Sequence, residues 1–141
     1  MDYRAAFQIS AAGMAAEKLR LDVTALNLAN MHAAGTSAEQ VYRPQRVVTQ
    51  TVSFSQQFGQ LAGAMAGVQT TVVLQNVAPR MVYEPGHPYA NAKGMVAYPG
   101  VDNVTEMVTL NTALRAYEAN VTAMNAARTM AARALDIGGQ Q

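Results

Sequence analysis

An apolar seam runs along the last third of the chain, from Val104 to Leu135, with intervals of three and four residues between most of its members. This spacing is typical of a coiled-coil helix, because it keeps the apolar side chains along one edge. The sequence therefore predicts a long carboxy-terminal helix that needs a partner along this edge. The seam consists of Met107, Leu110, Leu114, Tyr117, Val121, Met124, Ala131 and Leu135.

The other faces of this predicted helix carry Ala, Thr, Asn and Val rather than charges. A surface helix normally presents a charged stripe to water, so a helix this poor in charge is expected to be surrounded by protein. A chain of 141 residues is too short to enclose such a helix by itself. Neighbouring subunits are the natural source of the missing contacts.

A second long helix is predicted over residues 5–31. Its large apolar residues Phe7, Met14, Leu21 and Leu28 recur every seven positions. Gly13 lies inside this helix, where glycine costs about 1 kcal/mol relative to alanine. We expect the close approach of a neighbouring backbone to require it.

The middle of the chain has a different composition, rich in Gly, Pro, Gln, Thr and Val. Runs of β-branched and apolar residues between turn formers predict short strands at 47–54, 69–74, 81–83 and 95–98. The glycine-containing stretch 56–67 is predicted to be a flexible loop. The expected fold class is α+β, with long N- and C-terminal helices pairing as a coiled coil and a small β-rich middle module. The corresponding division of the chain is 1–32, 33–100 and 101–141.

A proline-rich segment from Tyr83 to Asn91 is predicted to be a rigid structural loop, because the residue before each proline is restricted to extended backbone. Glu84 and His87 could also be metal ligands or an acid and base, but the sequence supplies neither a third ligand nor a pocket. The rigid loop is the favoured interpretation. Its residues are Tyr83, Glu84, Pro85, Gly86, His87, Pro88 and Asn91.

Several function classes are not supported by the composition. Charged residues are 13% of the chain and the formal net charge is +1, which leaves no basic stripe for nucleic acid. The chain has no cysteine, and no phosphate-binding loop or nucleophile elbow is present. No run approaches the roughly 20 apolar residues of a membrane span, and the start of the chain is a poor match to a cleaved signal peptide. We therefore expect that the protein is not an enzyme and that it binds no cofactor or metal ion.

Two motifs at opposite ends of the chain carry a family resemblance. Residues Ser10–Met14 and Asn27–Asn30 resemble the amino-terminal motif shared by bacterial flagellar rod and hook proteins. Residues 106–108 and 115–120 are similar to their carboxy-terminal motif. The loop 83–91 resembles, more narrowly, the small proximal rod proteins of the flagellar basal body. Together the motifs cover nearly the whole chain.

The resemblance implies a structural subunit of the proximal rod, and not an enzyme. It implies terminal helices that assemble helically to transmit torque and to form the wall of the export channel. The implied partners are copies of the chain, other rod proteins, the flagellar export apparatus and the basal-body base, without nucleic acid or direct membrane insertion. The implied location is the periplasmic rod, reached by flagellar type III secretion without a cleaved signal peptide. An adaptor or export partner that binds one other protein through a coiled coil is the alternative.

The assembly interface is expected on the apolar helix positions and on the asparagines of the amino-terminal motif. These residues are Phe7, Met14, Leu21, Asn27, Leu28, Asn30, Met107, Leu110, Leu114, Tyr117, Val121, Met124 and Leu135.

Overall fold

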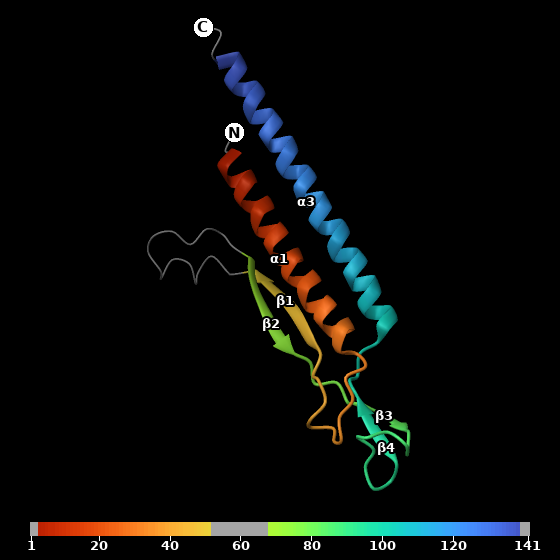
Figure 1. Ribbon diagram of the computed structural model, residues 1–141. Helices are drawn as coiled ribbons and strands as arrows, with labels where there is room; N and C mark the ends of the chain where they lie inside the picture. Colours follow the sequence, from red (N-terminus) through yellow and green to blue (C-terminus); the bar gives the residue numbers. More distant parts are fainter. Residues whose placement is uncertain (1–2, 52–67, 139–141) are drawn as a thin grey trace, which may run out of the picture. The chain divides into compact units, whose positions relative to one another are not determined.

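The computed structural model describes residues 3–51 and 68–138 of the chain (Figure 1). Its elements are helix α1 (Tyr3–Asn30), strands β1 (Gln45–Thr51), β2 (Val68–Leu74), β3 (Arg80–Tyr83) and β4 (Met95–Tyr98), and helix α3 (Asn103–Gly138). The strands form two two-stranded sheets, β1 with β2 and β3 with β4. The predicted α+β class, with long terminal helices and a small β-rich middle, is confirmed. The predicted flexible loop 56–67 lies outside the described residues.

The chain divides into two compact units. One comprises Met1–Leu19, Thr49–Thr70 and Thr112–Gln141, and the other comprises Arg20–Val48 and Thr71–Asn111. Each unit therefore contains a length of α1 and a length of α3. The division into segments 1–32, 33–100 and 101–141 stays a prediction.

The buried stripe of α3 consists of small or polar residues. Ala113 and Ala127 are buried, and Glu106 and Asn120 are partly buried, so that these four positions follow one another at intervals of seven. On α1 the buried residues are also short, namely Ser10, Ala16, Val23, Thr24 and Asn27. Among the described residues, the buried apolar side chains are those of alanine, valine and proline alone.

This stripe differs from the predicted seam by one residue. On α3 the predicted positions Met107 and Leu114 are exposed, whereas Glu106 and Ala113 beside them turn inward. Leu110, Tyr117, Val121 and Met124 are partly buried, in agreement with the predicted edge. The difference has a physical cause: short side chains allow two helices to approach closely, and the larger residues are then left on the flank of the contact.

Gly13 illustrates this close approach. A Cβ atom at this position would lie 2.7 Å from Oδ1 of Asn120, whose side-chain amide donates a hydrogen bond of 2.9 Å to the carbonyl of Ala116. The expectation of a neighbouring backbone is therefore wrong in detail, because a side chain fills the space beside Gly13. Because the Asn120 side chain is held in place by its hydrogen bond within α3, only glycine fits at position 13 of α1.

Helix α3 begins at a capped end. The carboxylate of Asp102 accepts hydrogen bonds from the hydroxyl and from the backbone N–H of Thr105, at 3.2 Å for the latter. These bonds from the Thr105 hydroxyl and N–H lower the pKa of Asp102. The cap satisfies one of the N–H groups that every helix leaves unpaired in its first turn.

Strands β3 and β4 form an antiparallel hairpin in which Arg80 pairs with Tyr98 and Tyr83 pairs with Met95. The connecting loop is folded onto itself: the backbone N–H of Glu84 bonds to the carbonyl of Gly94 at 2.9 Å, and that of Gly94 bonds to Asn91 at 2.8 Å. Gly94 has a φ of 73°, and a Cβ atom there would lie 2.8 Å from Cε2 of Tyr83. Both the backbone angle and the contact require glycine.

We expect Gly94→Ala to lower the free energy of unfolding by about 2 kcal/mol, because it adds left-handed strain and a clash with the Tyr83 ring. Gly86→Ala in the same loop is the matched control, since a Cβ atom there meets nothing within 4 Å. Its effect should stay below about 0.5 kcal/mol. Urea unfolding of the two variants measures the difference, and equal effects would contradict this description of the loop.

Candidate functional site

The side chain of Asn27 on α1 makes four hydrogen bonds to residues far from it in the sequence. It is 1% exposed, and all of its hydrogen-bonding capacity is used. Its Oδ1 accepts from the hydroxyl of Tyr42 at 2.8 Å and from the backbone N–H of Gln45 at 2.9 Å. Its Nδ2 donates to the carbonyl of Gln45 at 2.8 Å and to Oε2 of Glu106 at 3.3 Å. One amide therefore joins α1, the start of β1 and the first turn of α3.

The Asn27 network sets the position of the strands relative to the helix ends within its unit. Gln45 is the first residue of β1, so its two bonds to Asn27 fix the point at which the strand leaves α1. Glu106 lies in the first turn of α3, four residues after the capping Asp102. In addition, the pKa of Tyr42 is raised. The main cause is burial of the phenol, and the nearby negative charge of Glu106 is the second cause. The network therefore favours the neutral form of Tyr42.

The predicted assembly residues on the helices fall into two groups. Asn27 is buried in the network, and Asn30 uses its side-chain amide to bond to the carbonyl of Leu26 at 2.8 Å. The large apolar residues instead lie partly buried or exposed. Phe7, Met14, Leu21, Leu28, Leu110, Tyr117, Val121 and Met124 are partly buried, and Met107, Leu114 and Leu135 are exposed. The interface role of both groups stays a prediction.

The predicted structural loop uses Glu84 and His87 internally. Oε2 of Glu84 accepts a hydrogen bond of 3.0 Å from the Tyr98 hydroxyl, and this bond, with burial, raises the pKa of Tyr98. Nδ1 of His87 accepts a bond of 3.1 Å from the backbone N–H of Tyr89. Asn91 closes the loop through its Oδ1, which accepts from the N–H groups of Lys93 and Met95 at 2.9 and 3.0 Å. The loop is held by its own side chains.

The described part of the chain contains neither a three-residue metal site nor a helix that could span a membrane. No group of three His, Asp or Glu side chains in residues 3–51 and 68–138 is arranged to hold a metal ion. Across the same residues, neither helix has a stretch both long and apolar enough for a membrane span. Glu84 and His87 therefore have no third ligand there.

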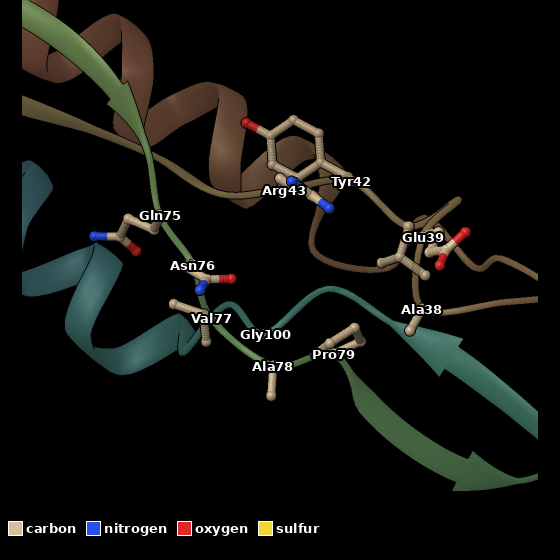
Figure 2. A pocket seen from close by; sticks show the side chains of 11 residues that line it. Ala38, Glu39, Tyr42, Arg43, Gln75, Asn76, Val77, Ala78, Pro79 and Gly100 are labelled. Atoms are coloured by element: carbon tan, nitrogen blue, oxygen red, sulfur yellow. The ribbon is translucent and has the colours of Figure 1, made fainter.

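A cavity of about 210 Å³ lies at the base of the β3–β4 hairpin (Figure 2). Figure 2 shows the side chains of Tyr42 and Arg43 on one side and the chain segment with Val77, Ala78 and Pro79 on the other. Gly100 closes the wall behind this segment, since a Cβ atom there would lie 2.5 Å from the carbonyl oxygen of Ala78. The cavity is further lined by Ala38, Glu39, Val41, Gln75 and Asn76.

The cavity was not predicted, and neither was the exposure of β2. Val72, Val73 and Leu74 are consecutive in β2 and all exposed. A half-buried strand normally alternates apolar and polar residues, so three apolar residues in succession are the sequence signal that both faces of a strand will be covered. The hydrogen bonds of Asn27 left no comparable signal, because its partners are far away in the sequence.

The sequence is similar to known proteins over nearly its whole length. Residues 92–137 match the family described as flagellar basal body rod FlgEFG protein C-terminal. The chain is 39% identical over 133 residues to flagellar basal-body rod protein FlgC of Salmonella typhimurium, covering 94% of this chain and 95% of that protein. It is 41% identical over 143 residues to FlgC of Bacillus subtilis, covering 92% and 94%. It is 33% identical to FlgC of Borreliella burgdorferi over 141 residues, covering 92% and 93%.

We expect Asn27→Ala to lower the free energy of unfolding by about 3 kcal/mol, because it leaves the N–H and carbonyl of Gln45 and the hydroxyl of Tyr42 without their partner. Asn30→Ala is the matched control in the same helical turn, since its amide bonds only within α1. That change should cost less than about 1 kcal/mol. Thermal or urea unfolding of both variants gives the comparison, and equal losses would show that the network is not the source of stability.

The raised pKa of Tyr42 predicts a loss of stability at alkaline pH. The folded protein favours the neutral phenol, so the stabilisation is fully present below the ordinary tyrosine pKa of 10.0 and is lost as the pH rises through the higher folded value. Tyr42→Phe should remove this part of the alkaline transition while lowering stability at neutral pH. Unfolding free energies measured across pH 10 test this. An alkaline profile identical in Tyr42→Phe and wild type would refute it.

Proposed function

Since the chain belongs to the family of flagellar basal-body rod proteins, we propose that it assembles with copies of itself and with other rod proteins through the outer flanks of α1 and α3. In this role it is a structural subunit of the rod that transmits torque and contributes to the wall of the export channel. It is not an enzyme. The flagellar export apparatus and the base of the basal body are its further partners.

The observation that carries this proposal is the distribution of large apolar side chains on α3. The buried residues of α3 are the short Ala113 and Ala127, whereas several large apolar residues are exposed: Leu114 is 45% exposed, Val108 is 61% exposed and Leu135 is 76% exposed. Further exposed members of the set are Val104, Met107, Met130 and Ile137. Large apolar residues in such number on one helix favour contact with other protein.

The polar residues of α3 support the same proposal. Thr109, Asn111, Asn120, Thr122 and Thr129 each bond through the side chain to the carbonyl four residues earlier in the helix. A polar group that already has a partner loses less on burial than one that must give up water. The exposed faces of α3 can therefore be covered by neighbouring subunits at small cost.

Torque transmission requires that the middle of the chain does not swivel on the helices. The Asn27 network supports this requirement, because it joins α1, β1 and α3 by bonds that leave no amide group unpaired. Contacts that repeat from subunit to subunit then produce a helical assembly rather than a closed dimer. A coiled-coil adaptor for one partner is not favoured, because the matched relatives are rod proteins.

We expect Leu114→Asp to prevent incorporation into the rod while leaving the subunit folded. The side chain is exposed in the subunit, so the added charge stays in water and does not destabilise the fold. Burial of the same carboxylate against a neighbouring subunit would remove it from water without an opposite charge beside it. A penalty of about 3 kcal/mol weakens each contact roughly 100-fold. Motility in soft agar, protein content of isolated basal bodies and the unfolding curve of the purified subunit are the measurements.

Asn125→Asp adds the same charge at an exposed polar position of the same helix and serves as the control. It should leave motility and incorporation near the wild-type level. Normal incorporation of Leu114→Asp at normal protein levels would count against assembly through this flank. A subunit that fails to fold would instead show that Leu114 belongs to the internal packing.

A further inference from the structure

The cavity at the base of the β3–β4 hairpin has the size of a socket for one side chain. Its volume of about 210 Å³ is below the roughly 300–1,000 Å³ of pockets that hold small-molecule ligands. Its lining combines the apolar residues Val77, Ala78 and Pro79 with the polar residue Asn76, whose side-chain amide lies on the cavity side of the strand in Figure 2. Such a lining suits a side chain that is apolar along its body and polar at its tip, as tyrosine is.

The loop at the other end of the same hairpin presents tyrosines. Tyr83 is 67% exposed and Tyr89 is 50% exposed. Tyr89 is held in place: its N–H bonds to His87, and the centres of the two rings are 5.7 Å apart. An aromatic side chain that is exposed yet already ordered loses little conformational entropy on binding, which is the property of interface hot spots.

The socket and the loop lie at opposite ends of one hairpin. Pro79 immediately precedes β3 and Gly100 is the second residue after the end of β4, so both cavity residues are at the base. Tyr89 lies in the connection between the strands. A short hairpin cannot bring its own loop back to its base. The cavity at the base and Tyr89 in the loop can therefore meet only between different subunits, in a head-to-tail arrangement.

We propose that Tyr89 of one copy of this chain inserts into the cavity formed by residues 38–39, 41–43, 75–79 and Gly100 of the next copy. This inference rests on the proposed function, and it adds a contact between middle modules to the contacts of the helices. The ring lies against Val77 and Pro79, and its hydroxyl reaches the amide of Asn76. The exposed apolar residues Val72, Val73 and Leu74 of β2, which precede the cavity in sequence, extend the surface.

The charges at the two ends agree with this arrangement. Lys93 is exposed in the loop that carries Tyr89, and Glu39 is exposed at the rim of the cavity. Arg43 also lines the cavity, but on the side of Tyr42, away from Glu39 (Figure 2). A loop entering from the Glu39 side therefore places its lysine next to a carboxylate.

The chain contains no cysteine, so cross-linking can be directed to two chosen positions. Variants Tyr89→Cys and Asn76→Cys are co-expressed, basal bodies are isolated, and mild oxidation is followed by gel electrophoresis. We expect a cross-linked dimer of this chain from the pair and from neither variant alone. Tyr89→Cys paired with Asn125→Cys is the control and should give no dimer. Ala78→Trp, which fills the cavity, should lower incorporation into basal bodies at least tenfold while leaving the unfolding curve of the purified subunit unchanged.

The outcomes separate this inference from the function on which it rests. If the wild-type chain is absent from isolated basal bodies, the proposed function fails and this contact fails with it. If the chain is present but the pair gives no dimer, or if Tyr89→Cys is linked to a different protein, only the contact between copies is refuted. Normal incorporation of Ala78→Trp would likewise show that nothing enters the cavity.

Discussion

The close contact between α1 and α3 determines how the rest of the chain is used. Asn120 of α3 fits beside Gly13 of α1 because the glycine has no Cβ, and the buried residues of the two helices include the short side chains of Ala16, Ala113 and Ala127. Such a contact buries little apolar area, and burial at about 25 cal/mol per Å² is the main source of stability. The large apolar side chains remain outside it, where further subunits can cover them.

Since the apolar core is slight, polar contacts have a larger share in defining the subunit. Asn27 provides four hydrogen bonds from a single buried side chain, and each of its partners is a group that would otherwise need water. Apolar contacts between Ala and Val surfaces permit sliding, whereas an amide that donates two hydrogen bonds and accepts two through its oxygen has one correct position. The network thus fixes the register between α1, β1 and α3 that a core of short side chains leaves open.

The sequence predicted the elements well and the helix contact less well. Strong periodicity over residues 5–31 and 104–135 identified both helices, and β-branched runs identified the strands, because these signals are local. The pattern of large apolar residues did not identify the short residues that are buried on α3: Ala113 is buried and Leu114 beside it is exposed, so the place of Leu114 in the assembly interface stays a prediction. The Asn27 network could not be predicted from pattern, since Tyr42, Gln45 and Glu106 are brought to it only by the tertiary fold. Family resemblance found Asn27 without revealing what its side chain does.

The loop between β3 and β4 shows how polar residues can serve as structure rather than chemistry. Glu84 and His87 have the residue types of an acid and a base, yet the carboxylate is bonded to Tyr98 and the imidazole to the backbone of Tyr89. With Asn91 and Gly94 they hold the loop in one shape without help from a hydrophobic core. A shape held in this way is retained when the loop projects into solvent or into a neighbouring protein. In a structural subunit, a rigid loop supplies a defined surface at a place too small to have a core of its own.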